Sequence, residues 1–265
     1  MKDIKRKLNS NSKVIFFALG ILLLIAIWEI IYLSTSHNTF PEFFSSIGEM
    51  LALMGNPSIW KALGYTFFRL VISLLFSILL GTIFGLLAAY FPPVEYVLKP
   101  LVYIITCFPT ASLIFVLIIY TKITSYLLVF IVTFPIMYKA VLGGGKIILK
   151  KYNDPIATEG RYSFINLIKV VLPLSLPYIF IGMAQAVGLG FKVEIMGEVF
   201  MTSWHFIGIG KLINEAYTNL DMLELFGLTF FAILTIIVLD TIIHFVKRWL
   251  FNKYGTEPVK VFSLR

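Results

Sequence analysis

The chain has 265 residues, of which 59% are hydrophobic and only 14% charged, and its mean hydropathy is +0.91. Soluble domains are about 45–50% apolar, so this composition excludes an ordinary soluble protein and predicts an all-α membrane protein with about six transmembrane helices. The net charge of +8 does not indicate nucleic-acid binding, because the basic residues follow the ends of apolar runs, as expected for membrane proteins.

Long apolar runs predict the transmembrane helices in chain order, at residues 14–34, 61–91, 98–121, 124–149, 172–202 and 223–250. The first run is longer than the apolar region of a signal peptide, about 7–15 residues, so we expect it to be retained as a helix. Residues 35–60 are poor in basic side chains and are predicted to lie on the extracytoplasmic membrane surface. Residues 61–250 are predicted to form a five-helix core with a loop at 150–170, between cytoplasmic ends at 1–13 and 251–265.

Lysine and arginine residues predict the orientation of the chain. If both termini are cytoplasmic, 17 of the 22 basic residues lie on the inner side of the membrane. Cytoplasmic segments of membrane proteins carry such an excess. The remaining basic residues lie outside or within the membrane: Lys61, Arg69, Lys122, Lys192 and Lys211.

Small residues in the apolar runs indicate close packing. Gly81 and Gly85 form a GxxxG pattern, which lets two helix backbones approach. The partner helix can belong to the same chain or to a second subunit. Cys107 is the single cysteine, which excludes a disulfide framework within one chain, and we expect it to be a small buried hydrophobic residue.

A polar segment beginning at Asp154 precedes the fifth apolar run and has the character of a docking surface. Asp154 and Pro155 suit the start of a short helix, because a carboxylate caps free N–H groups and proline fits the first turn. Gly160 permits a close backbone approach. The segment then presents a charge and aromatic rings, residue types that are enriched in interface hot spots: Arg161, Tyr162 and Phe164.

The spacing of this segment resembles a known family. Gly160 stands thirteen residues before Pro173 of Leu172-Pro173, as in the cytoplasmic EAA motif of ABC importer permeases of the nitrate, sulfonate, taurine and thiamine-precursor group. The acidic start departs from that motif, so either Asp154 or Glu159 would supply the carboxylate. Other landmarks follow the order seen in these permeases: Phe40-Pro41, SIWKALGYTFFRLVIS, Gly81 and Gly85, Lys99-Pro100-Leu101, CFPTASLIFVLIIY, and Glu198 followed by Gly208 and Gly210.

This resemblance implies a type I-like permease fold in a bacterial cytoplasmic membrane. It also implies two ATPase subunits that carry ATP and magnesium, a second permease copy or paralogue, and an extracytoplasmic substrate-binding protein. The chain itself would have no catalytic site and no bound cofactor or metal. The substrate would be a small polar or anionic organic molecule, such as a sulfonate or a thiamine precursor. The residues that contact the ATPase would be Asp154, Thr158, Glu159, Gly160, Arg161, Tyr162 and Phe164.

Polar residues within the apolar runs are candidates for the translocation pathway, because ionisable groups are costly at membrane depth. At about 100° per residue, Gln185 and Lys192 share one helix face and Glu194 and Glu198 share another. Lys192 would contact an anionic substrate group or form a structural ion pair with Glu29 or a glutamate of its own run. The candidates for the pathway are Phe108, Pro109, Gln185, Lys192, Glu194 and Glu198.

Two other functions are compatible with this composition. An ion-coupled secondary carrier would work without an ATPase, using Asp240 or the glutamates of the fifth run, but it should show internal inverted repeats, and none is evident. A membrane-embedded enzyme would need paired catalytic groups. The sequence has no phosphate-binding lysine loop, zinc-protease motif or nucleophile elbow.

Overall fold

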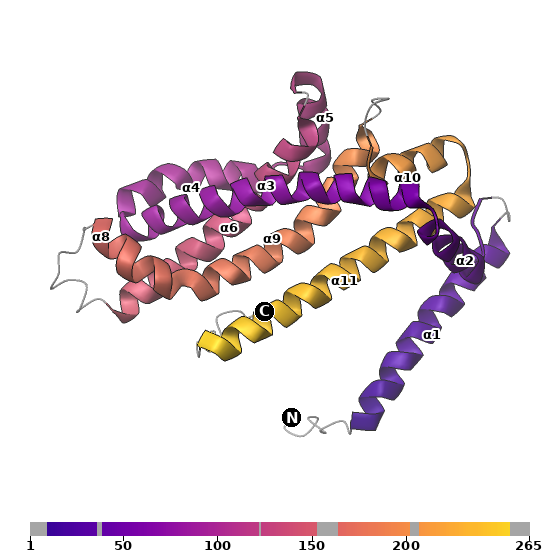
Figure 1. The fold of residues 1–265 in the computed structure, drawn as a ribbon, viewed down its shortest axis with the longest axis horizontal. Coiled ribbons are helices and arrows are strands. Elements are labelled where there is room, and N and C mark those ends of the chain that lie inside the picture. The colour runs from indigo at the N-terminus through magenta and orange to yellow at the C-terminus, as the bar shows by residue number, and fades with distance from the viewer. Residues whose placement is uncertain (1–9, 36–38, 122, 153–163, 202–206, 255–265) are drawn as a thin grey trace, which may run out of the picture. The chain divides into compact units, whose positions relative to one another are not determined.

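The computed structural model describes residues 10–35, 39–121, 123–152, 164–201 and 207–254 (Figure 1). Every regular element in these ranges is helical. The elements are α1 (Ser10–Ser34), α2 (Phe43–Met54), α3 (Pro57–Tyr90), α4 (Pro92–Cys107), α5 (Thr110–Tyr120), α6 (Thr124–Lys151), α8 (Phe164–Asn166), the π-helical turn η1 (Leu167–Val171), α9 (Leu172–Phe200), α10 (Ile209–Thr218) and α11 (Met222–Tyr254).

Five helical stretches are long and apolar enough to cross a membrane: Val14–Ser34, Pro57–Tyr90, Thr124–Lys151, Phe164–Phe200 and Met222–Val246. The pair of α4 and α5 gives a sixth if it is counted as one span. The predicted class, an all-α membrane protein of about six spans, is therefore confirmed.

The predicted helix at 98–121 is not straight. It consists of α4 and α5, which meet at an angle of 98° (Figure 1). Phe108 has an extended backbone, with ψ at 127°, a conformation that the following proline favours because it disfavours the helical region for the residue before it. Pro109 then begins α5 without a backbone N–H group. The end of α4 is open here, and Cys107, expected to be buried, is exposed.

The chain divides into two compact units, and the smaller one comprises residues 1–57 and 213–231. In this unit α1 is attached through Trp28, whose indole N–H donates a hydrogen bond to the Pro41 carbonyl over 3.1 Å. A carboxylate oxygen of Glu29 accepts the Phe43 N–H over 3.2 Å. The Trp28 ring lies against four aromatic rings: Phe40, Phe43, Phe226 and Phe230.

The larger unit comprises residues 58–212 and 232–265, and within it α9 packs along α6. The glycine pair of α3 faces α6. A Cβ atom on Gly81 would lie 2.5 Å from the Met137 Cβ, and one on Gly85 would lie 2.8 Å from the Val141 Cβ. The GxxxG pattern therefore brings two helices of the same chain together.

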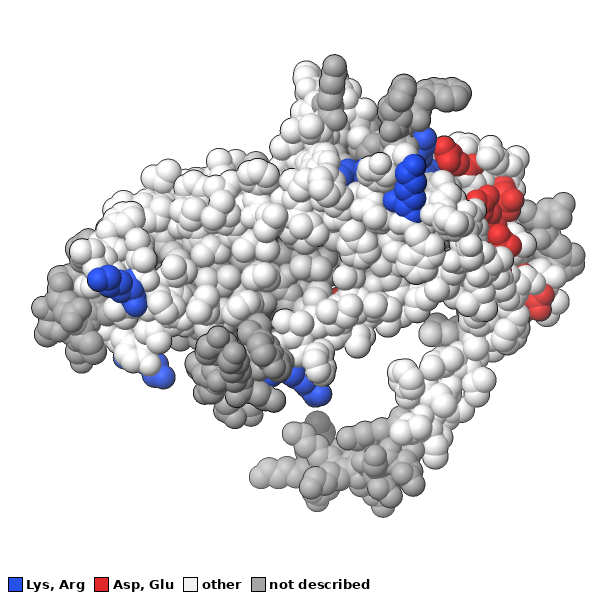
Figure 2. Space-filling view, viewed as in Figure 1, with Lys and Arg blue, Asp and Glu red and all other residues white. Residues whose placement is uncertain are grey.

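The surface of the molecule suits a lipid environment. The membrane-length stretch of α1 has none of its residues buried, and large apolar side chains are exposed along α3, α5 and α9. In Figure 2 few charged side chains interrupt the surface formed by the larger unit. Exposed apolar surface of this extent marks a membrane-facing protein.

Candidate functional site

A polar face on α3 is the starting point of the site. Thr66, Arg69, Ser73 and Ser77 are all buried, although they lie within an apolar helix of membrane length. Their spacings of three and four residues place them on one side of the helix. The hydroxyl groups of Ser73 and Ser77 both have hydrogen-bond partners. Ser73 donates to the Arg69 carbonyl, and the Ser77 hydroxyl is hydrogen-bonded to the Thr133 hydroxyl of α6 at 2.6 Å.

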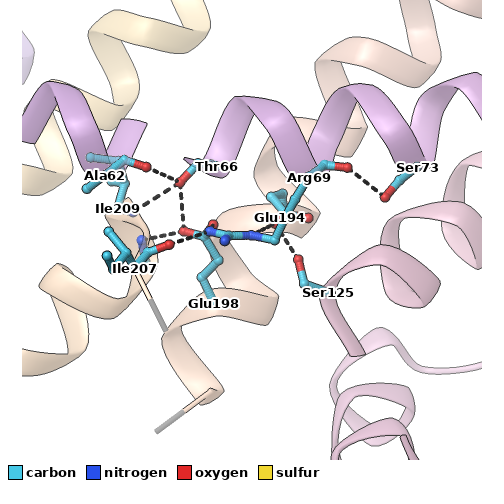
Figure 3. A network of polar contacts seen from close by, with 10 residues as sticks. Ala62, Thr66, Arg69, Ser73, Ser125, Glu194, Glu198, Ile207 and Ile209 are labelled. Atoms are coloured by element: carbon cyan, nitrogen blue, oxygen red, sulfur yellow. Dashed lines mark hydrogen bonds and ion pairs between the residues drawn. The ribbon is translucent and has the colours of Figure 1, made fainter. Parts of the chain in front are cut away.

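Arg69 is only 6% exposed and joins α3 to α9 (Figure 3). Its Nε lies 3.0 Å from Glu194 Oε1, and its Nη2 forms an ion pair with Glu198 Oε1. The same Nη2 donates to the Ile207 carbonyl over 2.7 Å. A planar guanidinium can hold several acceptors in this way, whereas a lysine offers a single point charge.

Both carboxylate oxygens of Glu198 have donors. Oε1 faces Arg69, and Oε2 accepts the Gly210 N–H over 2.8 Å and lies 3.0 Å from the Thr66 hydroxyl oxygen. The Thr66 hydroxyl also accepts the Ile209 N–H over 3.1 Å. Glu198 therefore ties α9 to α3 and to the first turn of α10.

Glu194 is bound less completely than Glu198. Its Oε1 accepts from Arg69 and from the Ser125 hydroxyl of α6, while its Oε2 is buried without a hydrogen-bond partner among the described residues. Neither glutamate has any exposed surface. One side chain thus carries an unsatisfied buried oxygen, which leaves the site with spare acceptor capacity.

The start of α10 fits against Glu198 only because Gly208 precedes the helix and Gly210 lies in its first turn. A Cβ atom on Gly208 would lie 2.5 Å from Arg69 Nη2, and one on Gly210 would lie 2.5 Å from Glu198 Cβ. No side chain can occupy such space without moving the ion pair. We call the whole arrangement the Arg69 clasp, which consists of the side chains of Thr66, Arg69, Ser125, Glu194 and Glu198 and the backbone of Ile207, Ile209 and Gly210.

The clasp fixes geometry rather than performing chemistry. Buried ion pairs gain little net stability, because desolvation offsets the attraction, but removing one partner is costly. Such a contact therefore holds α3, α6, α9 and the start of α10 in one arrangement. Among the residues that the structure describes, no group of three His, Cys, Asp or Glu side chains could hold a metal ion.

The structure separates the residues predicted to line a pathway. Glu194 and Glu198 do share a face, and it is turned inward to Arg69. Gln185 and Lys192 are exposed and do not belong to this buried face of α9. The buried glutamates thus pair with Arg69, and not with Lys192. Phe108 and Pro109 are exposed at the bend between α4 and α5. Whether these residues contact a substrate stays a prediction.

Most residues predicted to contact an ATPase lie outside the described residues, namely Asp154, Thr158, Glu159, Gly160, Arg161 and Tyr162. Phe164 is described and begins α8, with 59% of its surface exposed. Its ring centroid lies 6.1 Å from that of Phe91. Ile165 and Ile168 are also more than half exposed, so the helix start presents an apolar surface.

Three residues of the clasp escaped the sequence interpretation: Thr66, Arg69 and Ser125. The available signal was Arg69 itself, a lone cation in a long apolar run with two acidic residues in another run. Its partners lie 125 and 129 positions away in the chain, so no local pattern pairs them.

The helices and the clasp define a polytopic membrane protein whose spans are held together by buried polar contacts. The chain belongs to the family described as the binding-protein-dependent transport system inner membrane component, whose profile matches residues 81–255.

Two curated relatives share a shorter stretch with this chain. Each is named "Bicarbonate transport system permease protein CmpB", one from Synechococcus elongatus and one from Synechococcus sp.. Both are 33% identical to the chain over 84 residues. The matched stretch covers 32% of this chain and only 30% of each relative.

Proposed function

We propose that this chain is the transmembrane permease subunit of an ATP-driven importer that works by alternating access. The observation that carries the proposal is the family match over residues 81–255, which includes the Gly160-to-Pro173 segment and every other predicted landmark from Gly81 onwards. The five or six apolar spans supply the membrane domain such a subunit needs. ATP and magnesium would be bound by the partner ATPase and not by this chain.

Two ATPase subunits would dock on the segment from Asp154 to Phe164. The distance from Gly160 to Pro173 supports this placement, as does the apolar surface formed by Phe164, Ile165 and Ile168 at the start of the helix. Exposed aromatic and aliphatic side chains next to an arginine are typical of a docking surface. A second permease copy or paralogue and an extracytoplasmic binding protein would complete the importer.

The substrate would be a small polar or anionic molecule. The relatives' name, bicarbonate transport system permease protein, supports an anionic substrate. Lys192 is the exposed cation on α9 and would be the contact for such a charge, because a lysine facing lipid would be costly. Sulfonates and thiamine precursors are organic substrates with compatible chemistry.

Copurification of an ATPase with the tagged permease tests this function. We expect an ATPase subunit to be recovered with the wild-type chain and to be lost with Gly160→Trp or Arg161→Glu. Lys99→Glu is the matched control, because it makes the same charge reversal on the same predicted side of the membrane but outside the docking segment.

The outcomes separate the parts of the proposal. If no ATPase is recovered with the wild-type chain, and purified protein takes up substrate under an ion gradient alone, the chain is a secondary carrier. If the ATPase is recovered equally with all three variants, the importer stands and the docking segment has been placed wrongly.

A further inference from the structure

A helical stretch without a break in the chain connects the predicted docking surface to the Arg69 clasp. The stretch Phe164–Phe200 contains 37 residues and includes α8, η1 and α9. A regular α-helix of this many residues would be about 55 Å long. The π-helical turn η1 and Pro177 lie within the stretch. Phe164 lies at one end, while Glu194 and Glu198 lie within two turns of the other end. A force applied at the docking surface therefore reaches the clasp through continuous helix.

The clasp resists sliding in a way that apolar packing does not. Helices packed by apolar side chains can shift past one another by small amounts during domain movements. Arg69 is held at two carboxylates and one carbonyl, so an axial shift of α9 along α3 would separate buried charges from their partners. The clasp thus fixes the register between the two helices at this end.

The ion pair between Lys146 and Glu95 differs in kind from the clasp. Lys146 lies 2.5 Å from Glu95 and joins α6 to α4, but half of the lysine side chain is exposed. Exposed pairs contribute little to stability and exchange readily with water. The buried connection between α3 and α9 is therefore the stronger mechanical constraint.

We propose that the Arg69 clasp is the rigid joint through which movement of α9 is transmitted to α3 and to the start of α10. This inference rests on the proposed function, in which an ATPase moves the inner end of α8 and α9. Arg69 is a positioning residue in this scheme and does not contact the substrate. The ion pairs and hydrogen bonds of the clasp persist throughout the transport cycle, so α9, α3 and the start of α10 move together.

The first test measures the ratio of transport to ATP hydrolysis in the reconstituted importer. The triple variant Arg69→Met, Glu194→Gln, Glu198→Gln removes all three charges while approximately keeping side-chain volume. We expect it to hydrolyse ATP at a rate near that of the wild type but to move about tenfold less substrate per ATP, within the usual range of coupling between distant sites. Lys146→Met is the control and should keep the wild-type ratio.

The second test follows the joint directly and leaves its residues intact. Spin labels would be attached at Phe68→Cys and Phe200→Cys, two exposed positions on α3 and α9, in a Cys107→Ser background. We expect the distance between the labels to be the same with and without ATP, and to become nucleotide-dependent when Glu198→Gln is added.

Each result decides between alternatives. A triple variant with the wild-type ratio, or a label distance that changes with ATP in the wild-type clasp, overturns the rigid joint. If the importer hydrolyses ATP and transports normally in these experiments, the proposed function survives the loss of this inference. If no ATPase associates with the chain, the proposed function fails first.

Discussion

Arg69 shows how one residue organises a membrane protein interior. It is a cation with 6% exposure that faces two fully buried carboxyl groups. In a low-dielectric interior each charge depends on its partners, because solvation by water is lost. The contribution of Arg69 is therefore best described as the cost of its removal and not as a bond energy.

We expect Arg69→Met to lower the free energy of unfolding by about 3–5 kcal/mol, because it leaves two carboxyl groups without their buried counter-charge. The triple variant with Glu194→Gln and Glu198→Gln should regain most of this loss, since neutral groups of similar volume often replace a buried ion pair without penalty. Unfolding of the detergent-solubilised proteins measures both. A triple variant as unstable as Arg69→Met would contradict this account.

The contact between α3 and α6 depends on two glycines. Met137 and Val141 occupy the space that side chains at positions 81 and 85 would need. Gly143 of α6 differs, because a Cβ atom there would meet nothing within 4 Å. The chain therefore offers a packed glycine and an open one in the same pair of helices.

Gly81→Leu should destabilise the protein by about 1–3 kcal/mol or more, because it overfills a packed contact. Gly143→Ala should instead leave stability unchanged or raise it by up to about 0.5–1 kcal/mol, because glycine is unfavourable within a helix. Thermal unfolding of the two variants provides the comparison. Equal effects from both substitutions would show that the α3–α6 contact is not close-packed.

The sequence predicted features that depend on helical periodicity, such as which residues share a helix face. It did not predict contacts between residues that are far apart in the chain. The shared face of Glu194 and Glu198 followed from helical geometry, and the structure confirms it. The bend at Phe108 was not predicted, because the run from 98 to 121 has the length and apolar character of one span, and a proline in such a run can kink a helix or end it. The helix that packs on Gly81 is determined by tertiary packing. The GxxxG pattern alone therefore allowed a partner helix in the same chain or in a second subunit.

At the scale of the whole molecule, the bent pair of α4 and α5 determines on which side of the membrane the C-terminus lies. Five long helices alone place the two termini on opposite sides of a membrane, whereas a sixth crossing by the bent pair places them on the same side. The distribution of basic residues predicts that both termini are cytoplasmic. The two observations agree only if the bent pair crosses.

Reporter fusions test this prediction. We expect a fluorescent protein to be fluorescent at either terminus, because it folds in the cytoplasm, and alkaline phosphatase to be inactive there. A truncated chain fused after Gly55, between α2 and α3, should give the opposite pattern, since residues 35–60 are predicted to be extracytoplasmic. A cytoplasmic N-terminus with an extracytoplasmic C-terminus would show that α4 and α5 form a re-entrant loop.

The Arg69 clasp extends across the boundary of the family match. Arg69 and Thr66 precede residue 81, while Glu194, Glu198 and Gly210 lie inside the matched range. A relative that lost the arginine but kept both glutamates would have two buried carboxylates without a counter-charge. A relative that lost the glutamates would have an unpaired buried arginine. We therefore expect Arg69 and the two glutamates to change together during evolution. The glutamates inside the matched range would then predict whether a relative has an arginine before that range.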